Sequence, residues 1–181
     1  HIMLSLRSHG WTRHLPKKNL VTGTKSDDLF EESFKFVLPG FNLRPGELHA
    51  AVGIEQLKKL DEFVLNRRKN AITFRRLFSN HPTFIIQQEI GSSSWFGFSM
   101  VICDTATVTR QELVQLLTEN EIECRPIVSG NFLKNPVLKY YNYSVHDSTP
   151  NADLIEKNGL FIGNHHYDLT QELEFLKQLL G

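Results

Sequence analysis

The stretch that decides the fold is Phe36-Val37-Leu38-Pro39-Gly40-Phe41-Asn42-Leu43-Arg44-Pro45-Gly46-Glu47-Leu48-His49-Ala50-Ala51-Val52-Gly53-Ile54-Glu55-Gln56-Leu57. It combines a short apolar run, a Pro-Gly turn and the start of a helix. Pro45 suits the first helical position, because its missing N–H costs nothing there. The prolines and glycines predict a fixed loop that presents Asn42 and Arg44, and the helix behind it would hold that loop in place. We therefore expect a binding loop here.

The composition indicates a folded chain with no strong charge preference. Hydrophobic residues make up 40% of the 181 residues, which is enough for a real core and argues against disorder. The 20 basic and 20 acidic residues leave no net charge, so nucleic acid and membrane surfaces are not expected as partners. The length fits one domain, or one domain and part of another.

The two cysteines, Cys103 and Cys124, lie far apart in the sequence and form no metal-type cluster. We expect reduced core thiols rather than a disulfide, and therefore a cytoplasmic protein. No run approaches the ~20 apolar residues that a membrane helix needs. Residues 1–3 do not resemble a signal peptide and are interpreted as a cloning remnant, with native sequence from about Met3.

The order of patterns predicts a loop-rich region followed by a long helix. Residues 4–45 have no clear helical or strand period and are expected to be loop, with at most one short strand. From Pro45 to about Phe78, apolar residues recur at steps of three, four or seven, which predicts a connecting helix over 46–80. Such a helix would be about 50 Å long. It would therefore run between two domains or be kinked near Arg67-Arg68-Lys69.

Residues 81–181 are expected to form a small α+β domain. Strands are predicted at 84–90, 95–103, 122–128 and 160–166, and Pro126 places the third of them at an edge or a bend. Thr109 and Glu112 form a capping-box pattern at the start of one helix. Further helices are predicted from Asn151 and from Thr170.

Candidate sites outside the opening stretch are few, and each has an ordinary structural alternative. His165 and His166 do not predict a metal site, because adjacent strand residues point to opposite faces and no carboxylate or cysteine lies at ligand spacing. The Arg67-Arg68-Lys69 cluster has acidic neighbours, which is typical of a solvated helix face. Arg125 leaves a strand before a Gly-Asn turn, and this pattern fits either a phosphate or carboxylate contact or a structural ion pair.

Several of these segments resemble the DegT-type family of nucleotide-sugar aminotransferases, which are fold-type I pyridoxal-phosphate enzymes. The resemblance is carried by Arg7-Ser8-His9-Gly10, by residues 38–45 and by the helix pattern over 47–57. Residues 125–132 and 163–166 resemble the 3-dehydratase branch, which acts on GDP- or CDP-4-keto-6-deoxyhexoses. The resemblance implies an α/β fold: the C-terminal part of such an enzyme, with a long helix before a small, mostly antiparallel sheet that has helices on one face.

The resemblance implies a function that this chain carries only in part. It implies a C-terminal fragment of a pyridoxamine-phosphate-dependent 3-dehydratase, which removes the sugar C3 hydroxyl in deoxysugar and lipopolysaccharide O-antigen biosynthesis. The family's catalytic base, a Lys in aminotransferases and a His in the dehydratase branch, lies upstream of Arg7. We therefore expect no catalytic residue here, no bound cofactor and no activity of the chain alone. Two alternatives remain: a fragment of a pyridoxal-phosphate-dependent 4-aminotransferase, and a non-catalytic interaction or assembly domain.

The resemblance also implies roles for individual residues. Asn42 is expected to donate its amide to the phosphate of the cofactor held by the partner subunit of a homodimer, and Arg44 to contact the substrate or that partner's site. The residues expected to face the nucleotide-sugar substrate are Arg125, Asn131, Asn164, His165 and His166. The segment between Gly10 and Phe36 lacks the cysteines of the iron–sulfur dehydratases, so the cluster-free kind is implied.

Overall fold

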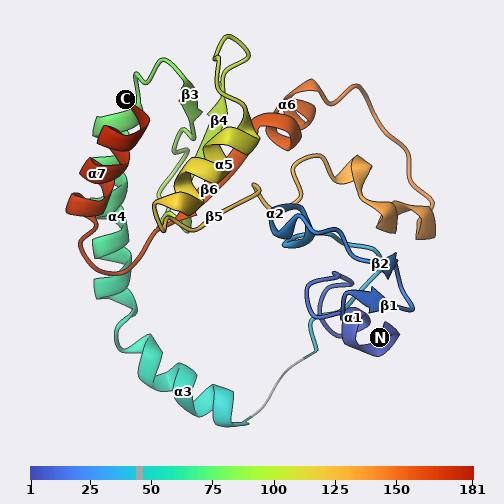
Figure 1. Ribbon diagram of the computed structural model, residues 1–181. Coiled ribbons are helices and arrows are strands. Elements are labelled where there is room, and N and C mark those ends of the chain that lie inside the picture. The colour runs from blue at the N-terminus through green and yellow to red at the C-terminus, as the bar shows by residue number, and fades with distance from the viewer. Residues whose placement is uncertain (44–46) are drawn as a thin grey trace. The chain divides into compact units, whose positions relative to one another are not determined.

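Strands from residues 84–163 form a small, mainly antiparallel sheet (Figure 1). In the computed structural model, which describes residues 1–43 and 47–181, its strand order is β3-β4-β6-β5. The strands are β3 (Phe84–Ile86), β4 (Gly97–Ile102), β5 (Cys124–Arg125) and β6 (Gly159–Gly163). Both β3 and β6 run antiparallel to β4, with Ile85 opposite Val101 and Leu160 opposite Met100. The four predicted strands are confirmed at shorter lengths, with β5 at an edge.

The chain divides into two compact units, and each unit is made from two separate segments. The first unit combines His1–Pro45 with Arg125–Lys157, and the second combines Gly46–Cys124 with Asn158–Gly181. The predicted domain bounds, 4–45, 46–80 and 81–181, stay a prediction. Residues 81–181 contribute to both units.

The core of the second unit is built where the sheet meets two packed helices. Helix α4 (Leu60–Phe78) buries Phe74 and Phe78, and the Phe74 ring stacks on Phe98 of β4 with centroids 4.5 Å apart. Helix α7 (Thr170–Leu180) packs against α4 and buries Leu173 and Leu176. These residues recur at three- or four-residue steps, so each helix turns one apolar face inward. Burial of side chains of this size contributes about 1.5–3 kcal/mol each.

Helix α5 (Arg110–Glu119) begins at the predicted capping box. The Thr109 hydroxyl accepts a hydrogen bond from the Glu112 backbone N–H at 3.2 Å, and the Glu112 carboxylate accepts one from the Thr109 N–H at 2.7 Å. The hydrogen bond from the Thr109 backbone, followed by that from its hydroxyl, lowers the pKa of Glu112 below its usual value. The helix buries Leu113 and Leu117, so both the cap and the apolar face were readable in the sequence.

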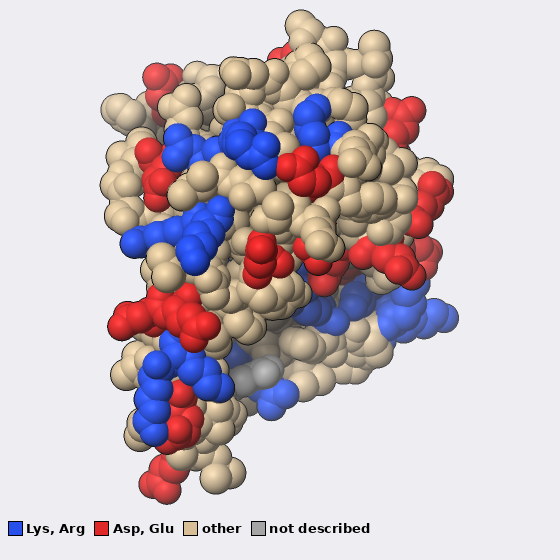
Figure 2. Space-filling model, turned by 90° about the vertical axis from the view of Figure 1, so that its left-hand side faces the viewer, with Lys and Arg blue, Asp and Glu red and all other residues tan. Residues whose placement is uncertain are grey.

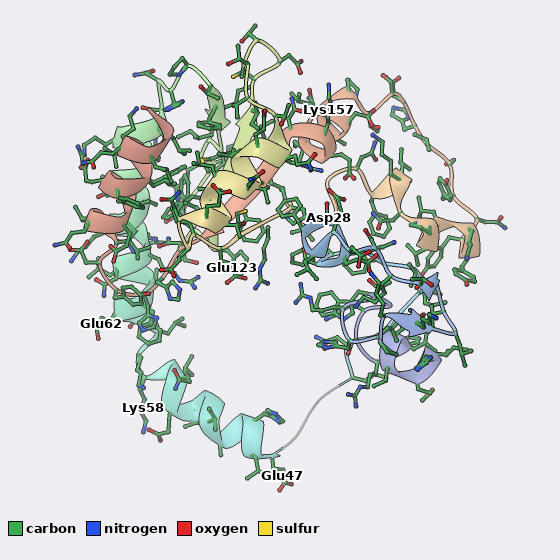
Figure 3. The ribbon with its side chains drawn as sticks, in the orientation of Figure 1. Asp28, Glu47, Lys58, Glu62, Glu123 and Lys157 are labelled. Carbon is green, nitrogen blue, oxygen red and sulfur yellow. The ribbon has the colours of Figure 1, made fainter. Side chains whose placement is uncertain are left out.

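The helix predicted over 46–80 is two helices. Helix α3 (Glu47–Leu57) ends before Lys58, and α4 begins at Leu60. Of the two predicted alternatives, a helix between two domains or a kink near Arg67-Arg68-Lys69, the kink is not observed there, because α4 continues through these residues. Figure 3 shows Glu47 at the start of α3, Lys58 just beyond its end, and Glu62 in the first turn of α4. No residue of α3 is buried. Among the described residues of the second unit, none packs over α3, so no packing holds α3 and α4 in one continuous helix. The regular spacing of apolar residues in the sequence does not reveal this break.

Charged side chains of both signs share the face of the molecule over α3, α4 and α7 (Figure 2). Arg76 of α4 pairs with Glu174 of α7 at 2.7 Å, and Arg75 lies 3.7 Å from Glu89. Both pairs are solvent-exposed, so each stabilises the fold by less than about 1 kcal/mol. This mixture fits the interpretation of the basic clusters as ordinary solvated helix surface.

The first unit consists of short elements. From its N-terminal segment come α1 (Ile2–Leu6), the paired strands β1 (Lys18–Asn19) and β2 (Gly23–Thr24), and α2 (Leu29–Glu32). From its second segment come the 3-10 helices η1 (Phe132–Lys134) and η2 (Pro136–Tyr140) and most of α6 (Pro150–Asn158). The N-terminal segment thus contains more regular structure than the single short strand predicted. Elements this short carry too little periodicity to be read from sequence.

Glu32 connects three parts of this N-terminal segment. Its buried carboxylate accepts hydrogen bonds from the Thr12 hydroxyl at 2.5 Å, the Ser26 backbone N–H at 3.1 Å and the Lys35 ammonium at 2.8 Å. Burial alone would raise the pKa of Glu32, but the hydrogen bonds, led by that from Lys35, outweigh it and lower the pKa. The ionised carboxylate is therefore part of the folded structure.

The first unit is expected to lose stability in acid through Glu32. Because its folded-state pKa lies below the ordinary value of 4.5, its contribution is complete above that pH and disappears as the pH falls through the folded-state pKa. Glu32→Gln should cost roughly 1–3 kcal/mol at neutral pH, since a neutral amide leaves the ammonium and hydroxyl donors poorly matched. Urea unfolding of both proteins from pH 7 to pH 3 tests this, and the two curves should converge in acid. Parallel curves across this range would contradict it.

The two cysteines are free thiols, as predicted. Burial, with a smaller effect of neighbouring Glu123, raises the pKa of Cys124 to about 11, so this thiol stays protonated at neutral pH. Among the described residues, no helix combines the length and the apolarity needed to cross a bilayer.

Candidate functional site

The loop that presents Asn42 is packed backbone to backbone against the Arg7-Ser8-His9-Gly10 segment. A methyl group at Gly40 would lie 2.0 Å from the Gly10 backbone nitrogen, and one at Gly10 would lie 1.7 Å from the Leu38 carbonyl oxygen. Gly10 also has a φ of +78°, in the left-handed region that favours glycine. The Arg7-Ser8-His9-Gly10 segment and the loop at Gly40, which lie far apart in the sequence, are therefore in direct backbone contact, and both glycines are needed for this approach.

Backbone hydrogen bonds hold the two segments in an antiparallel arrangement. The His9 N–H donates to the Phe41 carbonyl at 3.0 Å, and the Val37 N–H donates to the Gly10 carbonyl at 2.9 Å. Isolated bridges pair Ser8 with Asn42 and residue 11 with residue 36. The backbone of Asn42 is thus fixed while its side chain is exposed. This combination suits a residue that donates to a ligand from a rigid frame.

An aromatic cluster stabilises the same frame. The Arg13 guanidinium lies 4.1 Å from the centroid of the Trp11 ring and donates to the Ser33 carbonyl at 2.6 Å. Trp11 in turn stacks on Phe36 at 6.2 Å, and Phe36 lies 6.3 Å from Phe132 of η1. These contacts join the two chain segments of the first unit.

The segment from Arg125 to Asn131 is a turn anchored at its far end. Arg125 is half-buried and has at least one interaction partner within the chain. Asn131 is 4% exposed, and its amide donates to Thr149 Oγ1 and Asp153 Oδ1, both at 3.0 Å. Its side-chain oxygen accepts from the Leu133 N–H. Both amide hydrogens of Asn131 are therefore donated within the chain. Any role of Asn131 in substrate binding would therefore be to hold the turn in shape.

Asn131 also takes part in a small charged network. Lys134 pairs with Asp153 at 2.7 Å. The hydrogen bond from Lys134, followed by the one from Asn131, lowers the pKa of Asp153 below its usual value. The carboxylate that orients the Asn131 amide is therefore ionised at neutral pH.

Asn164 follows β6 and pairs with a second buried asparagine that the sequence did not single out. Its amide donates to the carbonyls of Arg67 and Trp95 at 3.0 and 2.9 Å, and its oxygen accepts from Asn70 at 3.1 Å. The Asn70 amide also lies at hydrogen-bonding distance from the carbonyls of His165 and Tyr167, and its oxygen accepts from the Leu169 N–H. The two amides are 2% and 3% exposed. Together they attach residues 164–169 to α4.

His165 and His166 lie on this loop rather than on a strand, and both side chains are exposed. The His166 ring lies 4.1 Å from Phe63 of α4, and the His165 ring stacks on Tyr167 at 4.8 Å. The backbone carbonyl of His166 accepts from Asn66 at 3.0 Å. The backbone carbonyls of residues 165–167 thus face α4, while the exposed rings of His165, His166 and Tyr167 are available to a ligand.

The predicted site residues fall into two groups. Asn42, Arg125 and Asn131 belong to the first unit, whereas Asn164, His165 and His166 are adjacent in the second. Arg44 lies outside the described residues. No group of three or more His, Cys, Asp or Glu side chains placed to hold a metal occurs in the described part of the chain. Sequence reasoning missed Gly10, Gly40 and Asn70 as positioning residues, although a polar Asn70 among the apolar residues of α4 was a usable signal.

Comparison with known protein families matches nearly the whole chain. The model described as the DegT/DnrJ/EryC1/StrS aminotransferase family matches residues 1–174. GDP-4-keto-6-deoxy-D-mannose 3-dehydratase of Escherichia coli O55:H7 is 59% identical over 181 residues, covering 99% of this chain and 47% of that protein. The Yersinia pseudotuberculosis protein of the same description is 56% identical over 99% of this chain and 46% of its own length. The chain thus spans about half the length of the curated relatives it matches.

Solved structures agree with this comparison. The E. coli GDP-4-keto-6-deoxy-D-mannose-3-dehydratase with bound hydrated PLP superposes with a TM-score of 0.74 at 58% identity, covering 100% of this chain and 47% of that one. The Helicobacter pylori aminotransferase of pseudoaminic acid biosynthesis superposes with a TM-score of 0.64 at 19% identity, which shows a shared fold alone. The predicted fold, helices with an antiparallel sheet as in the C-terminal part of an aminotransferase-fold enzyme, is confirmed.

Proposed function

Because the chain belongs to the DegT/DnrJ/EryC1/StrS aminotransferase family, we propose that it is the C-terminal part of a nucleotide-sugar 3-dehydratase. The reaction would remove the C3 hydroxyl from a GDP-linked 4-keto-6-deoxyhexose. The observation that carries this proposal is the 59% identity to the E. coli dehydratase along nearly the whole chain. The aminotransferase alternative has weaker support, since the GDP-perosamine synthase of Vibrio cholerae is 29% identical over only 90 residues.

The residues of the first unit fit a phosphate-bearing cofactor. Asn42 has a fixed backbone and an exposed amide, so it can donate to phosphate oxygens without first being ordered. We propose that it serves pyridoxal or pyridoxamine phosphate held by a partner subunit. When bound, that cofactor supplies the electron sink for loss of the hydroxyl. Asn42 itself orients the phosphate and moves no proton.

Helix α3 supports the proposal that this chain works within a larger assembly. Leu48, Val52, Ile54 and Leu57 are 84%, 60%, 63% and 67% exposed, so apolar side chains on more than one side of α3 are uncovered within this chain. A helix of this length is marginal in water without packing. We propose that α3 packs against the remaining part of a full-length enzyme that functions as a homodimer in the cytoplasm.

Substrate contacts are proposed for each unit taken by itself. Arg125, whose planar guanidinium can bind phosphate oxygens in pairs, would neutralise the diphosphate of the nucleotide. His165 and His166 would contact the nucleotide through their exposed rings, while Asn131 and Asn164 hold the two loops in shape. A GDP-4-keto-6-deoxymannose-3-dehydratase variant has been solved with GDP-perosamine bound, which supports a GDP-linked sugar as the ligand class.

A chimaeric enzyme tests the proposal. Residues 4–181 are fused to the N-terminal half of the E. coli relative in place of that relative's own C-terminal half, and C3 dehydration of GDP-4-keto-6-deoxymannose is followed. We expect activity from the chimaera and none from the isolated chain. Asn42→Ala should weaken pyridoxamine-phosphate binding about tenfold to a hundredfold, because one hydrogen bond to a charged group is lost.

Leu20→Ala is the matched control, since Leu20 is 85% exposed in the same unit and has no proposed role. Cofactor affinity, measured by absorbance titration, should be unchanged in this variant. A folded but inactive chimaera would refute the proposed function. An active chimaera whose Asn42→Ala variant binds the cofactor normally would refute only the role of Asn42.

A further inference from the structure

Val128 is a β-branched residue in a backbone conformation that such residues rarely adopt. Its φ is 43°, in the left-handed region where the β-branched side chain crowds the backbone. It occupies the first central position of a turn closed by the Gly130 N–H, which donates to the Ile127 carbonyl at 2.8 Å. Glycine, asparagine and aspartate are the residues normally found where a turn needs a positive φ. Val128 is therefore strained.

The other non-glycine residues with positive φ in the described ranges each have a local reason for it. Trp95 buries a large side chain that is 1% exposed. Glu121 follows the end of α5, where its N–H and the next one donate to helix carbonyls. His9 lies where Gly10 and Gly40 bring two segments together. Neither reason applies to Val128. Its side chain is 51% exposed, and it lies in a turn after strand β5 rather than at the end of a helix.

Contacts of Gly130 and Asn131, just beyond Val128, maintain this strain. Gly130 has a φ of 49°, and a methyl group there would lie 2.1 Å from the Glu156 carboxylate. The Asn131 N–H donates to that same carboxylate at 2.9 Å, and the Asn131 side chain is anchored on Thr149 and Asp153. The turn therefore cannot relax without breaking these contacts. An observed outlier held in this way is a reason to look for function.

We propose that Val128 is a specificity-determining residue whose side chain contacts the C6 methyl group of the bound sugar. The inference rests on the proposed function. An exposed apolar side chain held under strain gains nothing within this chain, so its contact lies with a ligand. Arg125, three residues earlier, suits the charged part of a nucleotide sugar, and a 6-deoxyhexose adds an apolar methyl group. A valine against that methyl group disfavours a C6 hydroxyl, which would be buried without a hydrogen-bond partner.

Val128→Gly separates strain from specificity. In the full 181-residue chain, the urea midpoint of unfolding should rise, because glycine adopts this conformation freely. In the chimaeric enzyme, the ratio of kcat/KM for GDP-4-keto-6-deoxymannose to that for its 6-hydroxy counterpart should fall about tenfold. A residue with only a structural role would not combine greater stability with poorer discrimination.

Val145→Gly is the matched control, because Val145 is 50% exposed in the same unit without a positive φ. It should not raise the urea midpoint, and it should leave the discrimination unchanged. If Val128→Gly does not raise the urea midpoint, or if an active chimaera discriminates equally well with either residue, the inference is overturned. An inactive wild-type chimaera would count against the proposed function first, and against this inference with it.

Discussion

Adding one methyl group at Gly10 is expected to lower the free energy of unfolding by roughly 3 kcal/mol and to displace the Asn42 loop. The new carbon would meet the Leu38 carbonyl oxygen at 1.7 Å, and backbone cannot move aside as a flexible side chain would. The overpacking costs about 1–3 kcal/mol, and the left-handed conformation adds about 1–2 kcal/mol. Urea unfolding of Gly10→Ala measures the loss. Gly40→Ala should cost a similar amount through its contact with Gly10 from the other side.

Gly23→Ala provides the control that isolates the close approach. Gly23 lies in the same unit with a φ of +75°, but a methyl group there would meet nothing within 4 Å. Its substitution should therefore cost only the conformational part, about 1–2 kcal/mol. Equal losses at Gly10 and Gly23 would show that the two motifs are not in backbone contact. In the chimaeric enzyme, Gly40→Ala should also weaken cofactor binding although residue 40 offers the cofactor no side chain.

Asn70→Ala is expected to destabilise the second unit by roughly 3 kcal/mol. The substitution removes the hydrogen-bond partners of the His165 and Tyr167 carbonyls and of the Leu169 N–H. It also removes the donor to the side-chain oxygen of Asn164. Buried polar groups that lose their partners cost about 1–3 kcal/mol each, part of which water entering the gap recovers. The measurement is urea unfolding, together with the NMR shifts of the two histidine rings, which should move as the loop loses its shape.

Asn66→Ala is the comparison for this variant. Asn66 is also on α4 and makes one hydrogen bond, to the His166 carbonyl at 3.0 Å, from a half-buried position. Its loss should cost about 0.5–1.5 kcal/mol, since water can replace it. If the two variants are equally stable, Asn70 is not the centre of the loop's attachment.

Local chemistry made much of this fold predictable. The Thr109–Glu112 cap, the alternation in β4 and the apolar faces of α4 and α7 each depend on neighbours a few residues away, and the structure reproduces them. The edge position predicted for the strand before Pro126 followed from the same local rules, whereas the antiparallel sheet was implied by the family resemblance. Such features need no knowledge of distant contacts.

The features that could not be predicted depend on contacts between distant segments. The helix break at Lys58 reflects the lack of packing on α3 within the second unit, and no local signal marks it. The Gly10–Gly40 approach joins two motifs that the sequence shows separately. The Asn70–Asn164 pair is 94 residues apart in sequence, so neither amide could be recognised as the partner of the other. The family resemblance implies that Asn131 and Asn164 face the substrate, and in the structure their amides have hydrogen-bond partners within the chain.

The division of each unit into two chain segments has a consequence for any attempt to take this protein apart. The chain enters the second unit at residue 46, leaves it after Cys124 and returns at Asn158. A single cut anywhere therefore splits at least one unit between two polypeptides. A fragment starting at residue 81 would keep the sheet but lose α3 and α4, and it would carry residues 125–157 without the rest of their unit. Gene truncations and split-protein designs have to respect this interleaving, which linear domain boundaries conceal.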